Sequence, residues 1–280
     1  MLCLVSMWGT SFMFISLAIE GGFTPTAITS LRILLGAAIL TCVVYFKGLR
    51  LPVDLRSWGA FMLLGLFGNA APFFLISWGQ QSVPSGTTGV LMAVMPLVTM
   101  VLAHYTVPNE RLNRYKILGC IAAFTGVYLL LSPSMNGTTA LLGQFAVLAA
   151  ACCYAINTIL IRLLPTFNPL VGSAGMLISA IVLTSPLYMH FGLQLPQQTD
   201  WLSIFSVIWM GVVPTGMASI IYFLVVERAG PSFLSNINFI IPVVAFLSGT
   251  LILAEPVTAQ NIIALVIILT GIATTRFRVS

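Results

Sequence analysis

One charged side chain lies inside a long apolar run of the sequence. Arg32 stands about six residues into the run 26–46, which places a guanidinium group roughly 9 Å deep at 1.5 Å per helical residue. The planar fork of N–H donors on arginine matches a carboxylate, so this residue predicts an anion-binding contact or a gate. The alternative is a structural arginine that bonds carbonyl groups of a neighbouring helix or extends toward the lipid headgroups.

Aromatic and polar residues recur at helical spacing in two parts of the chain. Trp8 and Ser11 are three residues apart, and Tyr154 and Asn157 repeat that spacing 146 positions later. Residues at i and i+3 share one face of a helix, so each pair presents a ring and a polar group to the same neighbour. We predict that such residues line a cavity, and interhelical hydrogen bonding is the alternative. The predicted cavity residues are Trp8, Ser11, Arg32, Asn69, Met92, Tyr154, Asn157, Tyr222 and Asn238.

No arrangement typical of catalysis or metal binding is found in the sequence. The zinc-protease, nucleophile-elbow and phosphate-loop motifs are missing, and no polar cluster combines a nucleophile with a base. The cysteines lie within apolar runs without the spacing of a zinc site, so we interpret them as small packing residues. We therefore predict a protein that is not an enzyme and that needs no cofactor and no metal. The five cysteines are Cys3, Cys42, Cys120, Cys152 and Cys153.

The composition indicates where these residues must be positioned. Of 280 residues, 59% are hydrophobic and 6% are charged, whereas soluble domains carry about 25% charged residues. So few charges cannot cover a water-exposed surface, and the mean hydropathy is +1.07. The net charge of +5 comes from basic residues spread thinly through loops, which argues against nucleic-acid binding. We predict a membrane protein with many spans.

A membrane-spanning helix needs about 20 mostly apolar residues, and the chain contains ten such runs. The runs are too long and too continuously apolar for barrel strands of about 9–11 residues, so the fold class predicted is an all-α integral membrane protein. The predicted spans are 2–19, 26–46, 57–79, 86–106, 114–131, 140–163, 169–190, 201–226, 231–252 and 259–277.

The basic residues predict the orientation of these spans. If the N-terminus is cytoplasmic, the cytoplasmic loops and tail hold ten of the eleven basic residues, and the opposite loops hold none. We therefore expect both termini to be cytoplasmic. The ten residues are Lys47, Arg50, Arg56, Arg111, Arg114, Lys116, Arg162, Arg228, Arg276 and Arg278.

The second half of the chain repeats the layout of the first. Pro96 and Pro242 interrupt apolar runs 146 residues apart, and Gly65 and Gly211 have the same separation. We predict two five-helix repeats, 1–135 and 136–280. Five is an odd number of spans, so the second repeat would be inserted upside down, as in many transporters. Prolines at matching depths indicate hinge or gating positions, or plain packing kinks as the alternative.

Two acidic residues occupy corresponding positions before the last span of each repeat. Glu110 and Glu255 stand in short turns, and an acid near a helix start complements the helix dipole. Pro256 and Thr258 also fit the start of a helix. The alternative is that the two acids latch gates at opposite faces of the membrane.

These residues together resemble the EamA-type transporters of the drug/metabolite transporter superfamily. The resemblance covers essentially the whole chain and implies ten spans around a central cavity lined mainly by spans 1, 3, 4, 6, 8 and 9. It also implies export or exchange of small metabolites, often amino acids, across a bacterial inner membrane. Pro84-Ser85-Gly86 departs from the alanine-rich opening that many relatives have in the fourth span. The matching features are residues 8–12 (WGTSF), Arg32 followed by Gly36, Ala37 and Ala38, the span of Pro96, NERL at 109–112, Gly119, Gly126, AEPVTAQ at 254–260 and Gly271.

We accordingly predict a transporter that moves a small metabolite by alternating access, with amino acids or similar zwitterions as favoured substrates. Arg32 would receive the substrate carboxylate. A channel or receptor-like membrane protein, or an integral-membrane transferase, remains the alternative. The expected partners are a small-molecule substrate and membrane lipid, without nucleic acid, and the protein would be a monomer or a homodimer in the bacterial inner membrane.

Overall fold

The computed structural model describes residues 2–108, 112–131, 137–191, 195–221 and 237–275, and helices make up most of this part of the chain. No β-strand occurs among these residues, so the predicted all-α fold class is confirmed. The first half contains α1 (Leu2–Glu20), α2 (Pro25–Phe46), α3 (Leu55–Gly65), η1 (Leu66–Ala70), α4 (Ala71–Gly79), α5 (Ser85–Met92), α6 (Met95–Thr106) and α7 (Arg114–Leu131). The second half contains α8 (Gly137–Leu163), α9 (Pro169–Phe191), α10 (Trp201–Met210), η2 (Gly211–Met217), α13 (Ile237–Ile252) and α14 (Ala259–Thr274).

Eight helical stretches in the described part are long and apolar enough to cross a membrane, and two shorter apolar helices, Ile240–Ile252 and Ala259–Thr274, accompany them. These ten correspond to the ten predicted runs, and for the first seven the ends agree with the prediction within four residues. The predicted spans 201–226, 231–252 and 259–277 lie partly outside the described residues. The chain is therefore a multi-pass membrane protein.

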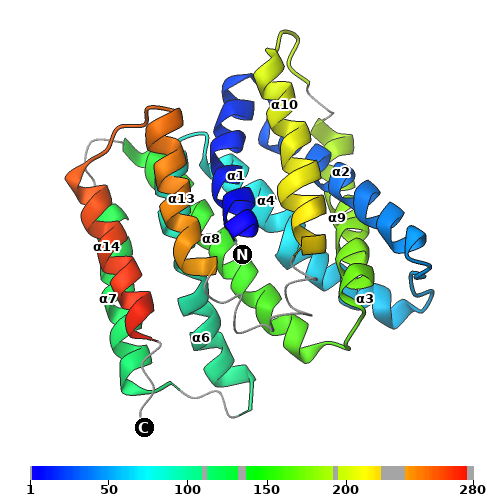
Figure 1. Cartoon of the computed structure of the whole chain (residues 1–280), viewed down its shortest axis with the longest axis horizontal. Helices are drawn as coiled ribbons and strands as arrows, with labels where there is room; N and C mark the ends of the chain where they lie inside the picture. Colours follow the sequence, from blue (N-terminus) through cyan, green and yellow to red (C-terminus); the bar gives the residue numbers. More distant parts are fainter. Residues whose placement is uncertain (1, 109–111, 132–136, 192–194, 222–236, 276–280) are drawn as a thin grey trace.

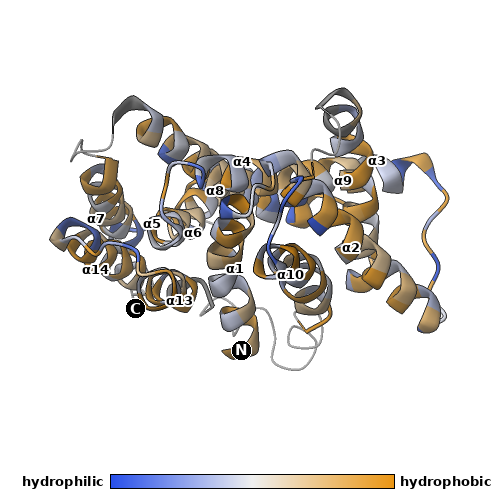
Figure 2. Cartoon of the chain, turned by 90° about the horizontal axis from the view of Figure 1, so that it is seen from above, coloured by the Kyte–Doolittle hydropathy of each residue, from blue (hydrophilic) through white to orange (hydrophobic). Residues whose placement is uncertain are grey.

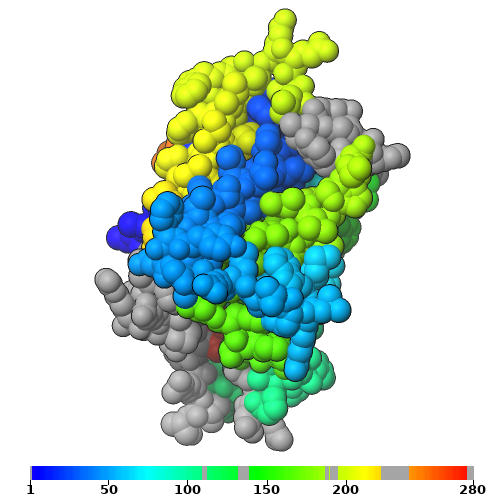
Figure 3. All heavy atoms as spheres, turned by 90° about the vertical axis from the view of Figure 1, so that its right-hand side faces the viewer, coloured from blue at the N-terminus to red at the C-terminus, as the bar shows by residue number. Residues whose placement is uncertain are grey.

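The helices form an elongated bundle (Figure 1). Helices α7 and α14 lie side by side at one end, and α2, α3 and α9 lie at the other. Between them α1, α4, α5, α8 and α13 pack together. Seen from above, hydrophobic residues cover most of every helix, and the hydrophilic ones lie mainly in connections (Figure 2). Large apolar side chains such as Phe46, Tyr128 and Leu251 are exposed, as expected for residues that contact lipid. Figure 3 shows the face made by α2, α3, α9 and α10.

Polar side chains in the connections determine where several helices begin. The Thr24 hydroxyl accepts a hydrogen bond from Ala27 N at 3.2 Å, directly before Pro25 opens α2. Asp54 caps α3 by accepting from Ser57 N at 2.8 Å. Thr258 caps α14 by accepting from Asn261 N at 3.1 Å, which confirms the predicted helix start.

Glycines allow α7 and α14 to approach closely. A Cβ atom added to Gly119 would overlap the Gly271 carbonyl oxygen, and one added to Gly271 would lie 2.7 Å from the Gly119 oxygen. Backbones in such contact leave no space for a side chain, and small residues are the common means of packing helices in a membrane.

Two spans contain a stretch of π-helix near their middle. η1 follows Gly65 in the third span and η2 begins at Gly211 in the eighth, and these two glycines are the pair separated by 146 residues. A π-helix is rare and marks functional sites more often than ordinary helix does, because it shifts side chains and backbone carbonyls out of register. These two segments hold the polar groups described next.

The fourth predicted span contains a break in its α-helical hydrogen bonding. α5 ends at Met92 and α6 begins at Met95, so the run 86–106 is interrupted at Ala93 and Val94. Pro96 occupies the first turn of α6, where proline needs no hydrogen-bond partner for its nitrogen. Its counterpart Pro242 lies inside α13, which continues from Ile237 to Ile252. The two prolines thus occupy different local structures.

Candidate functional site

Arg32 is buried at the meeting point of three elements. Its side chain is 6% exposed, and its Nε atom donates to Thr215 Oγ1 of η2 at 2.8 Å. The guanidinium carbon lies 3.9 Å from the centroid of the Phe73 ring on α4. A cation over an aromatic face is attracted by the ring quadrupole, so Phe73 and Thr215 both stabilise the charge. The arginine therefore stays at depth and is held by a hydroxyl and a ring from two other spans.

Thr215 is arranged to accept a hydrogen bond from Arg32. Its hydroxyl donates to the Met210 carbonyl at 2.8 Å, five residues earlier in the chain. A hydroxyl has a single proton, and with that proton directed to Met210 its lone pairs face Nε. Gly36 makes room for this contact, because a Cβ atom there would lie 2.6 Å from Thr215 Cγ2.

Most donors of the guanidinium have no hydrogen-bond partner among the described residues. Within the part of the chain that the structure describes, the hydrogen bond at Nε is the one that Arg32 makes. The two Nη groups form the end of the fork, and this end can bind both oxygens of a carboxylate. Tyr154 of α8 is half-buried and packs against two apolar clusters, one of which contains Phe73. An anion at this position would offset a charge that costs several kcal/mol when it is uncompensated within a membrane.

Trp8 contacts the same π-helical segment from α1. Its indole Nε1 donates to the Pro214 carbonyl at 3.0 Å. Pro214 and Thr215 are adjacent, so two predicted cavity residues, Trp8 and Arg32, bind neighbouring positions of η2. Ser11 lies one turn further along α1 and is buried.

The other π-helical segment brings together two further predicted residues, one within it and one on α8. Asn69 belongs to η1 and is 8% exposed. Asn157 of α8 packs on its neighbour Gly68, where an added Cβ atom would lie 2.9 Å from Asn157 Oδ1. That oxygen is buried and has no hydrogen-bond partner among the described residues. An unpaired buried acceptor is costly, which makes Asn157 a second polar position with unused binding capacity.

The remaining predicted residues lie on α5, α6 and α13 or outside the described part. Met92 ends α5 and packs against two apolar clusters. Tyr222 lies outside the described residues, and Asn238 belongs to α13 without a described side chain. Of the predicted hinge positions, Pro96 directly follows the break between α5 and α6, and Pro242 lies within a helix.

Two residues that hold Arg32 are absent from the sequence-based set. Thr215 lies 146 residues after Asn69, the separation that relates the other repeated pairs, and this spacing could have identified it. Phe73 has no comparable signal, because phenylalanine is common throughout the spans.

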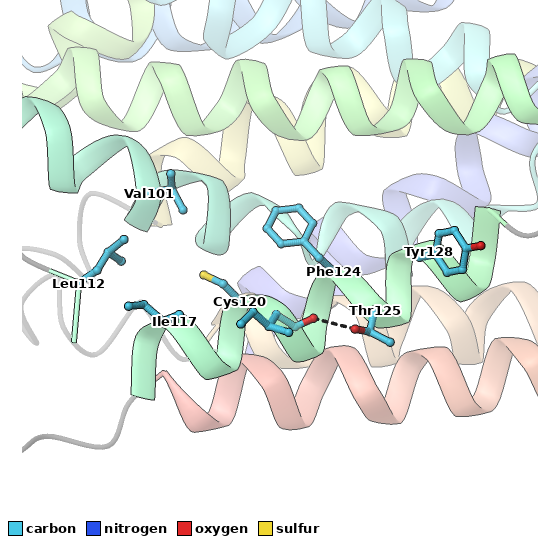
Figure 4. A pocket seen from close by; sticks show the side chains of 8 residues that line it. Val101, Leu112, Ile117, Cys120, Phe124, Thr125 and Tyr128 are labelled. Atoms are coloured by element: carbon cyan, nitrogen blue, oxygen red, sulfur yellow. Dashed lines mark hydrogen bonds between the residues drawn. The ribbon is translucent and has the colours of Figure 1, made fainter. Parts of the chain in front are cut away.

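A groove elsewhere on the molecule does not contain these residues. It has a volume of about 490 Å³ and is lined mainly by apolar side chains of α6 and α7 (Figure 4). Phe124, Thr125 and Tyr128 of α7 border it, and the Thr125 hydroxyl is used in a bond to the Ile121 carbonyl at 2.9 Å. With so few polar groups, this groove suits contact with lipid better than recognition of a polar solute.

No group of three or more histidine, cysteine and acidic residues that could hold a metal ion occurs among the described residues. The cysteines are free thiols, and Cys3, Cys42 and Cys152 are exposed on the apolar surface. The polar chemistry of the described interior is therefore provided by arginine, hydroxyl, amide and indole groups.

Comparison with known proteins identifies relatives along the whole chain. The model of the EamA-like transporter family matches residues 1–132 and 141–277. The chain is 24% identical over 280 residues to the uncharacterized transporter YoaV of Bacillus subtilis, covering 98% of this chain and 94% of that protein. It is 25% identical to a probable amino-acid metabolite efflux pump of Salmonella typhimurium, covering 97% and 91% of the two chains. A solved crystal structure with 20% identity superimposes with a TM-score of 0.70 over 98% of this chain and 94% of its own, which supports the fold.

Proposed function

Because the chain belongs to the EamA-like transporter family of the drug/metabolite transporter superfamily, we propose that it exports or exchanges an amino acid or similar zwitterion by alternating access. In this mechanism two inverted halves, 1–135 and 136–280, enclose a compartment that opens to one face of the membrane at a time. The distant relative from Salmonella typhimurium carries a name that mentions amino acids, which supports this substrate class.

The observation that carries the proposal is the clamp on Arg32. The hydrogen bond from Nε to Thr215 and the Phe73 ring orient the guanidinium, and among the described residues nothing else binds the two Nη groups, which would receive a carboxylate. A bound carboxylate would neutralise a charge that is otherwise costly at this depth. The unpartnered Oδ1 of Asn157 is an acceptor that suits an ammonium group.

The clamp also joins the two proposed halves. Trp8 and Arg32 come from the first half, and their partners, Pro214 and Thr215, come from the second. A substrate bound at Arg32 would therefore contact the boundary along which the halves move. Binding can shift the equilibrium between the two conformations only through such differential contacts.

The location and orientation follow from the charges. We place the protein in a bacterial inner membrane with both termini in the cytoplasm, because basic residues gather in cytoplasmic loops. It would act without enzymatic chemistry, with a small-molecule substrate and membrane lipid as partners. It would not bind nucleic acid, and it would work as a monomer or a homodimer.

Counterflow in proteoliposomes tests the proposal. Vesicles loaded with an unlabelled amino-acid panel should accumulate the labelled substrate through the wild type and through Arg50→Gln, whose arginine is exposed in a loop. Uptake of the labelled substrate through Arg32→Gln should be at least about tenfold lower than through the wild type, because the substitution removes one charge-assisted interaction with the substrate. Undiminished uptake by Arg32→Gln would overturn the assignment of Arg32, and the absence of counterflow across amino-acid, nucleobase and sugar panels would overturn transport by exchange.

A further inference from the structure

The start of α5 is capped by a side chain from the far end of the sequence. Ser85 N donates to Glu255 Oε1 at 2.6 Å, and Gly86 N donates to Glu255 Oε2 at 2.9 Å. Both carboxylate oxygens thus bind the free N–H groups of a helix that has no side-chain cap of its own. Glu255 therefore complements the dipole of α5, whereas the sequence suggested that it would serve the following helix, α14.

The backbone around Glu255 is shaped for this contact. Ala254 has a φ of 53°, a left-handed conformation that L residues rarely adopt, and it turns the chain back after α13. The Glu255 N–H then donates to the Gly249 carbonyl at 3.1 Å. Gly249 has no side chain at the place where a Cβ atom would overlap Glu255 Oε2. Thr258 caps α14, so the Glu255 carboxylate is not needed there.

Small residues bring α5 and α13 close together. A Cβ atom added to Gly89 would overlap Ala245 Cβ, and one added to Gly86 would lie 3.4 Å from Phe246 Cα. At its other end α5 passes into α6 through Ala93 and Val94, whose N–H groups bond three residues back, to Val90 O at 3.1 Å and Leu91 O at 3.2 Å. A 3₁₀-type stretch inside a helix often marks a hinge. The eight-residue helix α5 is thus bounded by a break in the span at one end and by a carboxylate at the other.

We propose that Glu255 is a latch that holds α5 against α13, and that α5 swings about the break at Ala93 and Val94 when the latch releases. This motion opens the space between α5 and α13 to the face that carries the connection 253–258. Charge-assisted hydrogen bonds to two N–H groups suit such a latch, because water can replace both when the helix end moves away. The matching residue of the first repeat, Glu110, lies outside the described residues, and the proposal does not depend on it.

Cysteine accessibility tests the latch without any substrate. In a variant whose five native cysteines are replaced by alanine, Thr88→Cys places a thiol one turn into α5, at a residue that is 0% exposed. Glu255→Gln should raise the rate of labelling by a bulky maleimide at least about tenfold, because it removes a charge-assisted contact. Glu20→Gln is the matched control, since it removes an exposed carboxylate at the end of α1, and it should leave the rate unchanged. Equal rates in all three proteins would refute the latch.

A disulfide that replaces the Glu255 contact distinguishes release of the latch from misfolding of the variant. A Cβ atom on Gly249 would lie 2.7 Å from Ser85 Oγ, so the pair Ser85→Cys and Gly249→Cys can form a disulfide. The same chain carries Glu255→Ala, which removes the carboxylate that would collide with a side chain at position 249. Oxidation should then return labelling at position 88 to the slow rate, and reduction should restore fast labelling there. Tandem mass spectrometry assigns the label to position 88, because reduction also frees the thiols at positions 85 and 249. Fast labelling of the oxidised protein would overturn the proposal, and either result is independent of the substrate assigned above.

Discussion

The Nε atom of Arg32 lies 2.8 Å from the Thr215 hydroxyl oxygen, across 183 residues of sequence. The bond joins the second span to the π-helical segment of the eighth, and it determines which edge of the guanidinium is left free. Since the Thr215 proton is directed to Met210 O, the hydroxyl can only accept from the arginine. Substitutions at either end of this bond should therefore change transport.

Thr215→Val should weaken transport, whereas Thr215→Ser keeps the hydroxyl and should transport as the wild type does. Valine has nearly the shape of threonine without the hydroxyl, so the Arg32 Nε–H would be left buried and unpaired at a cost of about 1–3 kcal/mol. We expect the KM for a carboxylate substrate to rise about tenfold or more, with a smaller change in maximal rate. Counterflow kinetics of the two variants measure this. Equal KM values for valine and serine would show that the hydroxyl does not orient Arg32.

Arg32→Lys should not replace arginine at this site. An ammonium group is a point charge without the planar fork, so it cannot hold Thr215 and present two further donors in a fixed plane. We expect the transport efficiency of Arg32→Lys to be at least about tenfold lower than that of the wild type. Its thermal midpoint should stay close to the wild-type value. Transport assays and thermal unfolding in detergent, measured on the same preparation, check both parts. Wild-type efficiency in Arg32→Lys would indicate that charge alone suffices.

Trp8→Phe removes the indole donor and keeps an aromatic ring. The Pro214 carbonyl then loses its bond to Nε1, which is 3.0 Å long. A typical hydrogen bond contributes about 1 kcal/mol net, so the free energy of unfolding should fall by about that amount. Unfolding in detergent measures the loss, and Trp201→Phe is the control because Trp201 is exposed. Equal effects of the two substitutions would contradict a specific role for the Trp8 bond.

Gly119→Ala should separate α7 from α14 and destabilise the fold. The added methyl group would overlap the Gly271 carbonyl oxygen, which is backbone and cannot rotate away. Overpacking of this kind costs about 1–3 kcal/mol. Gly59→Ala is the matched control, because nothing lies within 4 Å of its added Cβ atom, and it should stabilise α3 by about 0.5–1 kcal/mol. Thermal midpoints of the two variants should therefore move in opposite directions.

Asp54 should make stability depend on pH at the acid end of the range. The Ser57 N–H and then the Ser57 hydroxyl bind its carboxylate, both at 2.8 Å, and they lower the pKa of Asp54 below its ordinary value of 3.8. A pKa that is lower in the folded state means that this stabilisation is present above the unfolded pKa and disappears as pH falls through the folded pKa. Asp54→Asn should therefore show a flatter stability profile than the wild type below about pH 4. Thermal midpoints between about pH 3 and pH 7 measure the difference, and parallel profiles would contradict the assignment.

The amino-acid sequence by itself determined the membrane class and the placement of the spans. The free energy of placing a helix in a membrane is summed over about 20 consecutive residues. This sum is large, and it does not depend on distant parts of the chain. The same local reasoning identified Thr258 as the start of α14 and Arg32 as a charge within a span, because a helix cap and an intramembrane charge are both properties of short stretches.

Only the tertiary structure decided which distant groups these residues bind. Glu255 is spaced as a cap for α14 and instead caps α5, and Arg32 binds Thr215, which belongs to another span. Pro96 follows a break in its span, whereas Pro242 lies within a continuous helix, although the sequence presents the two alike. Such choices depend on how helices far apart in the chain rotate and approach one another. The competing arrangements differ by only a few hydrogen bonds, about 1 kcal/mol each, so short-range patterns do not separate them.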